Sequence, residues 1–573
     1  MSPPLPNLET FPALRAWQRK ALVEYLRRRS PDFMAVATPG AGKTTFALRI
    51  AAELLADGTV EAVTVVCPTE HLKTQWSQAA ARVGIQLDPS FRNSDVHSSR
   101  DFHGAVLTYA QVGMAPAVHR RRTMTRPTMV ILDEIHHAGD SRTWGDGVKS
   151  AFEEAERRLM LTGTPFRSDD NPIPFVAYER GRDGLQRSRS DSVYGYSDAL
   201  RDGVVRPVIF LAYSGETRWR TSAGDELAAR LGEPMTKDLI AQAWRTALDH
   251  RGDWMPQVLR AADARLSRLR EDGIPDAGGL VIASDQQTAR AYAKLISEIS
   301  GEPAVVVLSD DQGASSRIAS FAQSEQRWMV AVRMVSEGVD IPRLAVGVYA
   351  TSASTPLYFA QAIGRFVRAR RTGETATVFV PSVPHLLGLA SEMEAERDHI
   401  LGAQKDPDGL DDDLLERAQR AEDAEGELEK RFEALSATAE LDQVIFDGTS
   451  FGTGARTGTP EEEEYLGLPG LLTPDQVAVL LNRRQSEQLA AQKRQKAAEP
   501  VSADPEPTVA LSAGERRNSL RRRLNTLVAA HHHRTDLPHG KIHAELRRLC
   551  GGPPSAQATI EQLEERIATI QTF

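Results

Sequence analysis

The sequence has only two cysteines, Cys67 and Cys550, among its 573 residues. That number excludes a disulfide framework and every cysteine-rich zinc module. The sequence also lacks any run of about 18 uncharged apolar residues, and its N-terminus lacks a basic segment followed by an apolar one. We therefore expect neither a membrane span nor a secretory signal, and we expect the protein to stay in the cytoplasm.

The composition is that of an ordinary multidomain globular protein, with 41% hydrophobic and 26% charged residues. The net charge of −9 comes from local segments. Asp406 to Asp442 contains 14 acidic and 4 basic residues, Glu461 to Glu464 adds four acids, and the rest of the chain carries +5. A modestly basic body with an acidic appendage is compatible with a polyanionic partner but does not require one.

The first 400 residues show two stretches in which short β-rich runs alternate with helical patterns. Such alternation is typical of an α/β fold with a parallel sheet. It predicts one such domain over residues 1–205 and a second over residues 276–400. Residues 206–275 are predicted to be a mainly helical connecting segment. The run GVVRPVIFLAY, residues 203–213, is predicted to be a strand that leads out of the first sheet into this segment.

The last 170 residues carry a weaker signal. Residues 401–510 are predicted to hold acidic and polar helices and linkers: a charged helix over Asp411 to Leu441, the Gly/Thr linker GTSFGTGARTGTP, and a polar helix over Thr473 to Ala498. Residues 511–573 are predicted to form a small basic helical domain. There, Arg521 in the run RRR is either a phosphate contact or part of a solvated helix face. The histidines at 531–533, 539 and 543 favour a basic helical surface over a metal site.

The strongest local motif is ATPGAGKTT, Ala37 to Thr45, at a transition from strand to helix. Glycines at this spacing let backbone amides approach a phosphate closely, and the helix N-terminus adds partial positive charge. Lys43 would reach the β and γ oxygens of a nucleotide, and the Thr44 hydroxyl would ligate Mg²⁺. The motif predicts an ATP site formed by Pro39, Gly40, Ala41, Gly42, Lys43, Thr44 and Thr45.

Two carboxylates, Asp133 and Glu134, follow the apolar run MVIL. A buried strand there would place them at its carboxyl end, where ligands bind in open parallel sheets. Asp133 would hold Mg²⁺, and Glu134 would polarise the attacking water.

These motifs and the ones that follow resemble superfamily two helicases and translocases of the DExH kind, within the DEAD/DEAH-box helicases. The resemblance covers about residues 10–385. It rests on LRAWQ (Leu14 to Gln18), CPTEHLKTQW from Cys67, LTYAQV from Leu107, DEIH from Asp133, TGTP (Thr162 to Pro165), RMVSEGVDIP from Arg333 and QAIGRFVR (Gln361 to Arg368). It implies two tandem RecA-like domains, ATP with Mg²⁺ as the bound nucleotide, and a nucleic-acid partner.

The resemblance also implies individual roles. Gln18 would contact adenine, Gln361 would position water, and Gly338 and Asp340 would contact nucleotide or ribose. Arg365 and Arg368 would reach the γ-phosphate as arginine fingers when the two domains close.

The same resemblance implies contacts to a nucleic-acid strand. Thr69, Thr108, Ser284 and Ser336 are candidate phosphate contacts, with a turn or cap residue as the alternative at each. Thr162 and Thr164 would relay between the Mg²⁺ site and the strand, and His136 would couple motifs. His137, its neighbour, is interpreted as structural.

The predicted function is ATP-dependent helicase or translocase activity, with DNA favoured over RNA, in repair, replication or defence. An RNA helicase is one alternative; its DEAD-type motif would end in Asp where this chain has His136. A motor or recruitment subunit that does not unwind is another, with the acidic arm or the C-terminal unit docking a protein partner. A nucleotide-switch scaffold, which would bind ATP without stimulation by nucleic acid, is a third. None of the eleven lysines has Asp or Glu two positions earlier, so a PD-ExK-type nuclease site is not expected.

Overall fold

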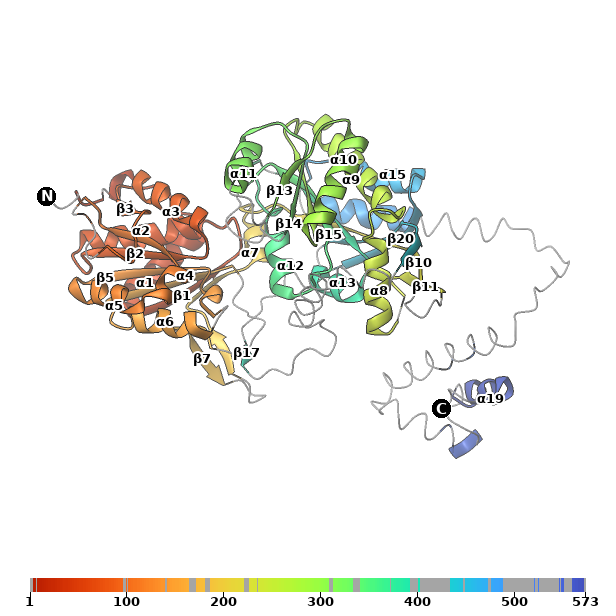
Figure 1. Ribbon diagram of the computed structural model, residues 1–573, viewed down its shortest axis with the longest axis horizontal. Helices are drawn as coiled ribbons and strands as arrows, with labels where there is room; N and C mark the ends of the chain where they lie inside the picture. Colours follow the sequence, from red (N-terminus) through yellow and green to blue (C-terminus); the bar gives the residue numbers. More distant parts are fainter. Residues whose placement is uncertain are drawn as a thin grey trace. The chain divides into compact units, whose positions relative to one another are not determined.

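The computed structural model describes most of the chain (Figure 1). The described residues are 4–6, 8–95, 99, 101–139, 142–163, 172–180, 186–220, 226–233, 235–308, 313–332, 341–371, 373–391, 400–401, 433–446, 449–472, 476–487, 520, 524, 546, 548–550 and 559–570. They fall into two compact units, Met1–Leu489 and Ala490–Phe573, and each is described by itself.

The first lobe is built on a seven-stranded sheet in which every neighbouring pair is parallel. The strands lie in the order β3 (Leu87–Asp88), β4 (Gly104–Thr108), β2 (Ala62–Cys67), β5 (Thr128–Asp133), β6 (Arg157–Thr162), β1 (Asp32–Ala37) and β9 (Ser192–Tyr194). The sequence-based expectation of a parallel α/β sheet is confirmed.

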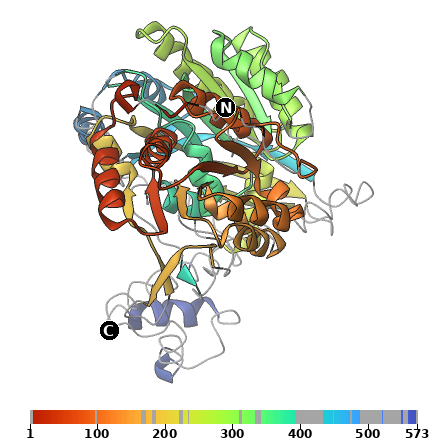
Figure 2. The same cartoon turned by 90° about the vertical axis from the view of Figure 1, so that its left-hand side faces the viewer.

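Helices cover both faces of this sheet (Figure 2). Because side chains alternate along a strand, Phe33 and Ala35 of β1 enter one core and Met34 and Val36 enter the other. The first core includes residues of α1 (Ala16–Arg28), α2 (Lys43–Ala56) and α3 (Glu70–Arg82). The second includes residues of α4 (Tyr109–Met114) and α6 (Arg142–Phe152). Strands buried on both faces explain the near-continuous apolar runs of the sequence.

The second lobe contains a ten-stranded sheet. Its main order is β13 (Val305–Val307), β14 (Trp328–Val332), β12 (Gly278–Ala283), β15 (Leu344–Ala350), β16 (Ala376–Pro381), β10 (Val208–Arg220), β19 (Glu440–Phe446) and β20 (Thr449–Arg456). The strands from β13 to β10 pair in parallel, as expected for a RecA-like domain. The later strands β19 and β20 add to it in antiparallel fashion.

The segment 206–275 contains more strand than expected. The run predicted to lead out of the first sheet is β10, a 13-residue strand of the second sheet. Its second half also pairs with β11 (Glu226–Leu231) and β18 (Glu433–Ala437). Two helices, α8 (Lys237–Ala247) and α9 (Trp254–Glu271), then match the helical prediction.

Two predictions beyond residue 400 are wrong where the structure describes them. The expected charged helix to Leu441 is strand from Glu433 onward, in β18 and the start of β19. The expected Gly/Thr linker forms β20, in which Phe451, Thr453 and Ala455 are buried and alternate with exposed positions. This period of two is a strand signal that the glycine content obscured. Residues 402–432 lie outside the described part.

The second unit contains a small hydrophobic core. Leu563, Ile567 and Ile570 of helix α19 (Ile560–Ile570) pack there with Leu524 and Leu546. The Arg521 position and the histidines at 531–533, 539 and 543 lie outside the described residues. Within the described part of the chain, no helix is both long and apolar enough to cross a bilayer.

Candidate functional site

The loop between β1 and α2 has the conformation that its glycines predict. Gly40 and Gly42 have φ values of +80° and +92°, in the left-handed region that glycine adopts without strain. Space is short as well, because a Cβ at Gly42 would lie 2.8 Å from Nε2 of Gln18. Thr44 and Thr45 are half-buried in the first turn of α2, directly after the loop.

Three side chains of the LRAWQ segment hold this loop from outside. Arg15 donates to the Gly40 carbonyl at 2.7 Å, Trp17 to the Ala41 carbonyl at 3.1 Å, and Gln18 to the Gly42 carbonyl at 2.9 Å. The Gln18 oxygen also accepts a hydrogen bond from the backbone N–H of Arg15. Both ends of the Gln18 amide are therefore engaged by protein groups here, instead of facing outward for an adenine contact.

The carboxylate of Glu134 lies next to the loop lysine. Its Oε1 is 3.0 Å from Nζ of Lys43, and its Oε2 accepts a hydrogen bond of 3.1 Å from the Gly163 backbone N–H. Lys43 also donates to the Ala37 carbonyl at 3.2 Å. Glu134 has a φ of +47°, which is uncommon for a residue with a Cβ and indicates local strain of the kind that collects at functional sites.

Asp133 is buried at the carboxyl end of β5, with 8% of its surface exposed. Its Oδ2 accepts a hydrogen bond of 2.7 Å from the indole N–H of Trp76 on α3. Burial first, and then the charge of Glu134, raise the pKa of Asp133 to about 6. For Glu134, burial opposes ionisation, but Lys43 and His136 outweigh it and lower the pKa to about 2.

A buried carboxylate whose ionised form is disfavoured by its surroundings suits a bound cation. Asp133 is close enough to Lys43, the first residue of α2, for the lysine charge to affect its pKa, and Thr44 follows Lys43. The carboxylate of Asp133 and the hydroxyl of Thr44 are the hard oxygen donors that Mg²⁺ prefers. The residues present therefore fit the Mg²⁺ that accompanies ATP. The described residues contain no cluster of three or more His, Cys, Asp or Glu that would form a separate metal site.

A chain of polar contacts joins the two lobes. Nδ1 of His136 is 2.9 Å from the Thr162 hydroxyl oxygen. Nε2 of Gln361, on helix α12 (Pro356–Ile363) of the second lobe, is 3.3 Å from Nε2 of His136 and also 3.3 Å from Nε2 of His137. His137, interpreted from the sequence as structural, thus lies as close to Gln361 as His136 does.

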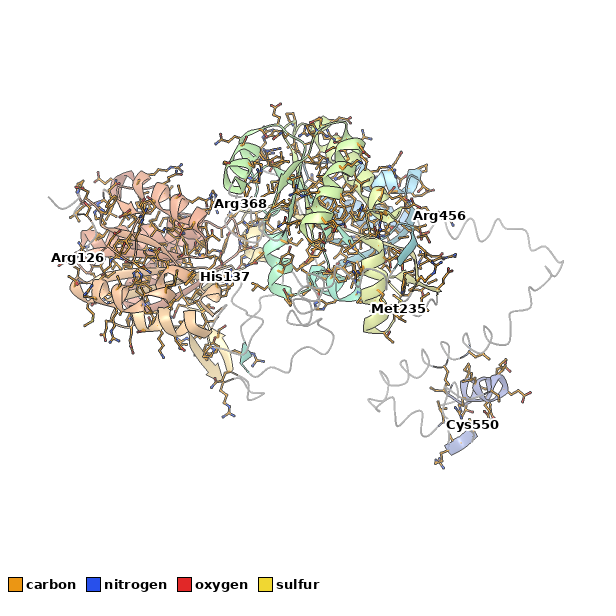
Figure 3. The ribbon with its side chains drawn as sticks, in the orientation of Figure 1. Arg126, His137, Met235, Arg368, Arg456 and Cys550 are labelled. Atoms are coloured by element: carbon orange, nitrogen blue, oxygen red, sulfur yellow. The ribbon has the colours of Figure 1, made fainter. Side chains whose placement is uncertain are left out.

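The segment after α12 lies against the phosphate loop. A Cβ at Gly364 would come within 2.8 Å of Cγ of Pro39, and a Cβ at Gly40 would come within 3.2 Å of Cγ of Arg368. Arg368 and His137 are labelled in Figure 3. The structure therefore brings Lys43, Glu134, Gln361 and Arg368 to one region, with Arg365 on the same segment.

The predicted nucleic-acid contacts have varied surroundings. The Thr108 hydroxyl caps α4 by accepting from the Gln111 backbone N–H at 3.1 Å, as the cap alternative predicts. The Ser284 hydroxyl accepts from the Ser352 N–H at 3.3 Å. The buried Thr69 hydroxyl has no hydrogen-bond partner among the described residues. Thr164, Ser336, Gly338 and Asp340 lie outside the described part of the chain.

The sequence reasoning missed several residues around this site. Arg15 and Trp17 were within a recognised motif, but their contacts to loop carbonyls had no sequence signal. Trp76 carried one: a tryptophan on a polar helix directly after a strand often has a partner for its N–H.

The two α/β lobes and the order of motifs match what the resemblance to DExH-type helicases and translocases of superfamily two implies. Residues 12–167 match the family model described as type III restriction enzyme, res subunit. The chain also shares a family with the Uncharacterized protein MT2985 of Mycobacterium tuberculosis. The two are 59% identical over 572 residues, which cover 99% of this chain and 94% of that protein.

Two further proteins are more distant. The DNA 3'-5' translocase XPB2 of Sulfurisphaera tokodaii is 24% identical over 387 residues, covering 64% of this chain and 81% of that protein. Among solved structures, a fragment of a putative HsdR subunit of a type I restriction enzyme from Vibrio vulnificus YJ016 matches with a TM-score of 0.46. That match has 14% identity and covers 68% of each chain.

Proposed function

We propose that the protein is an ATP-hydrolysing motor that moves along nucleic acid, with DNA favoured over RNA. The observation that carries the proposal is the contact of Gln361 with His136 and His137, beside the Lys43–Glu134 pair. Because these groups come from two lobes, binding and hydrolysis of one nucleotide can change how the lobes meet. Such a change is what a translocating motor needs.

Each residue has a proposed task in hydrolysis. Lys43 leaves Glu134 to neutralise the β and γ oxygens, and Glu134, ionised at neutral pH, orients the attacking water. When bound, Mg²⁺ supplies charge neutralisation at the phosphate oxygens, held by Thr44 and Asp133. Arg365 and Arg368 stabilise the charge that develops on the transferred phosphoryl group, and Gln361 helps to position the water.

The nucleotide is proposed to sit on the loop from Pro39 to Thr45. Gly338 and Asp340 are proposed contacts to the nucleotide or its ribose. In this structure Gln18 braces the loop through the Gly42 carbonyl, so an adenine contact requires its amide to exchange partners. That exchange would link adenine binding to the loop conformation.

The nucleic-acid strand is proposed to contact Thr69, Thr108, Ser284 and Ser336 through its phosphates. The Thr69 hydroxyl, which is buried and has no partner in the part of the chain that the structure describes, is the contact best supported by geometry, because a buried hydroxyl is costly without an acceptor or donor. DNA is favoured because LRAWQ, TGTP and SEGVDIP resemble repair and restriction motors. The distant similarity to the DNA 3'-5' translocase XPB2 supports the same choice.

The test is the ATPase rate of the purified chain with single-stranded DNA, duplex DNA, forked DNA or RNA. We expect DNA to stimulate turnover more than RNA does. Stimulation by RNA alone would favour the RNA helicase alternative, and ATP binding without stimulation by any of the four would contradict the motor.

A second assay separates the helicase from a motor subunit that does not unwind. Strand displacement by the chain alone supports the first. DNA-stimulated ATPase without displacement supports a motor or recruitment subunit, whose acidic arm or C-terminal unit would dock a protein partner.

A further inference from the structure

We propose that a buried ion pair, Arg206 with Glu374, positions the segment 365–370, which carries Arg365 and Arg368, against the nucleotide loop. We call it the finger segment. This inference rests on the proposed ATPase function and adds two positioning residues that none of the helicase motifs contains. Nη1 of Arg206 lies 3.3 Å from Oε2 of Glu374, and the side chains are 1% and 0% exposed. Arg206 stands two residues before β10, at the start of the second lobe.

Arg206 contacts the finger segment on its backbone. Its Nε donates to the Phe366 carbonyl at 2.7 Å, and its own backbone N–H donates to the Val367 carbonyl at 2.8 Å. Its Nη2 donates to the Leu344 carbonyl at the start of β15. One planar guanidinium therefore fixes the chain between Arg365 and Arg368 relative to the sheet.

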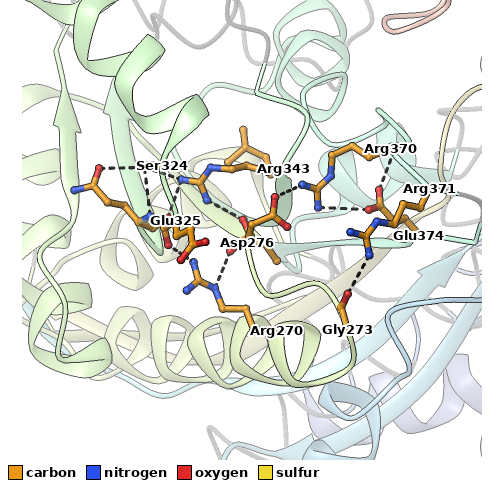
Figure 4. Close-up of polar contacts among 12 residues, drawn as sticks. Arg270, Gly273, Asp276, Ser324, Glu325, Arg343, Arg370, Arg371 and Glu374 are labelled. Atoms are coloured by element: carbon orange, nitrogen blue, oxygen red, sulfur yellow. Dashed lines mark hydrogen bonds and ion pairs between the residues drawn. The ribbon is translucent and has the colours of Figure 1, made fainter.

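Glu374 holds the other end of the same segment. Its Oε2 accepts a hydrogen bond of 3.0 Å from the Arg370 backbone N–H, and its Oε1 forms an ion pair of 3.4 Å with Nη2 of Arg370. The Arg370 guanidinium in turn lies 2.5 Å from Oδ2 of Asp276 (Figure 4). The segment 366–370 is thus held at both ends by one charged pair.

The residue before Arg206 touches the nucleotide loop. Val205 forms an isolated antiparallel bridge with Arg368, and its Cγ1 would be 3.8 Å from a Cβ at Gly40. The hydroxyl of Tyr196, the first residue of helix α7 (Tyr196–Arg201), donates to the Arg206 carbonyl at 3.0 Å. The chain that connects the two lobes therefore contacts the finger segment, and both lie close to the nucleotide loop.

A buried charged pair needs a reason, because desolvation makes it a poor way to gain stability. An apolar pair would pack as well, but it would leave the carbonyls of Phe366 and Leu344 without these donors. Burial lowers the pKa of Arg206 to about 10, so the guanidinium stays charged at neutral pH. We infer that the Arg206–Glu374 pair is present because it fixes the geometry of the finger segment.

The test compares Arg206→Lys and Glu374→Gln with a matched control, Arg265→Lys. Arg265 is another fully buried arginine of this lobe, and it donates to Thr377 and to the Leu466 and Leu468 carbonyls, outside the finger segment. We expect all three variants to lower Tm. Only the first two should lower kcat for ATP, by about tenfold or more, because misplaced fingers cost transition-state stabilisation. The KM for ATP should change less than about threefold in each.

Amide hydrogen exchange supplies a readout that does not depend on activity. Arg206→Lys and Glu374→Gln should speed exchange in the peptide over 364–371, and Arg265→Lys should not. Equal kcat and equal exchange in all three variants would overturn the proposal. A wild-type chain without ATPase activity would instead refute the proposed function, and the exchange result would still decide whether the pair orders this segment.

Discussion

At the residue scale, the Lys43–Glu134 pair is the most direct sign of hydrolytic chemistry. The ion pair of 3.0 Å with Lys43 lowers the pKa of Glu134, and Glu134 is further held by the Gly163 N–H. A carboxylate with a pKa of about 2 is a weak base in bulk terms. It suits a role in orienting water better than one in taking its proton outright.

Replacing either member of this pair should impair ATP turnover, but through different steps. Lys43→Ala should weaken ATP binding and remove activity. Glu134→Gln should keep ATP affinity within a few-fold and lower kcat by about 100-fold or more. Nucleotide binding by fluorescence and steady-state ATPase assays measure the two effects. Glu156→Gln, at an exposed position, serves as the control. Retained turnover in both site variants would refute the site assignment.

A second residue-scale prediction concerns stability and pH. His119 is buried in the first lobe, with Nε2 3.0 Å from the Asn93 side-chain oxygen. Burial, and then the charge of Arg122, lower the pKa of His119 to about 4. The unfolded chain, with a histidine pKa of about 6.5, therefore binds more protons between pH 6.5 and 4, and stability falls as the pH falls through that window.

His119→Gln should remove that contribution. Denaturant unfolding from pH 7 to pH 5 should show a slope that is smaller by up to about 1.4 kcal/mol per pH unit than in the wild type. An unchanged slope would mean that His119 is already protonated in the folded chain.

At the element scale, the second lobe extends beyond the last helicase motif. β19 pairs with β10 in the middle of the sheet, and the Arg265 side chain of α9 reaches the end of helix α15 (Pro460–Leu466). The carboxylate of Glu462 on α15 is buried and accepts a hydrogen bond of 2.5 Å from the Tyr213 hydroxyl. The segment from 433 to 472 is therefore part of the core of this lobe.

Truncation tests this conclusion. A chain ending at residue 400 should lose cooperative unfolding of the second lobe, because β10 would expose a long unpaired edge and apolar surface. A chain ending at Leu489 keeps these strands and should keep the wild-type Tm of the first unit. Circular dichroism melting compares the two. Cooperative melting of the shorter chain at the wild-type temperature would show that β18–β20 are dispensable.

The elements that could be predicted from the sequence are those with a strong local pattern. The apolar strand β1, which leads into the loop with Gly40, and the apolar strand β5, which ends at Asp133, were predicted because both their period and their spacing are distinctive. β18 to β20 were not found, since charged and glycine-rich residues hide a short alternation of buried and exposed side chains. Arg206 and Glu374 could not be paired from sequence, because 168 positions separate them and only the tertiary fold brings them together.

At the scale of the whole first unit, Gln361 of the second lobe contacts the two histidines that follow the Asp133–Glu134 motif of the first lobe. With one amide N 3.3 Å from two imidazoles, its contacts are lost together when the lobes separate. Coupling between the nucleotide and the lobes should therefore depend on it more than nucleotide binding does.

Gln361→Ala should lower nucleic-acid-stimulated ATPase by about tenfold or more and leave ATP affinity within a few-fold. Gln287→Ala, at an exposed position on helix α10 (Gln286–Ser300) of the same lobe, should change neither quantity. The two variants are compared by ATPase titration with single-stranded DNA. Full stimulation in Gln361→Ala would place the coupling elsewhere.

The claim on which the account depends is that both lobes act on one nucleotide. The direct measurement is a structure of the full chain with ADP, aluminium fluoride, Mg²⁺ and single-stranded DNA. The account predicts the guanidinium groups of Arg365 and Arg368 within hydrogen-bonding distance, about 3 Å, of the fluoride atoms, with Lys43 on the opposite side. Guanidinium groups that point away from the fluoride in a closed, DNA-bound complex would contradict it.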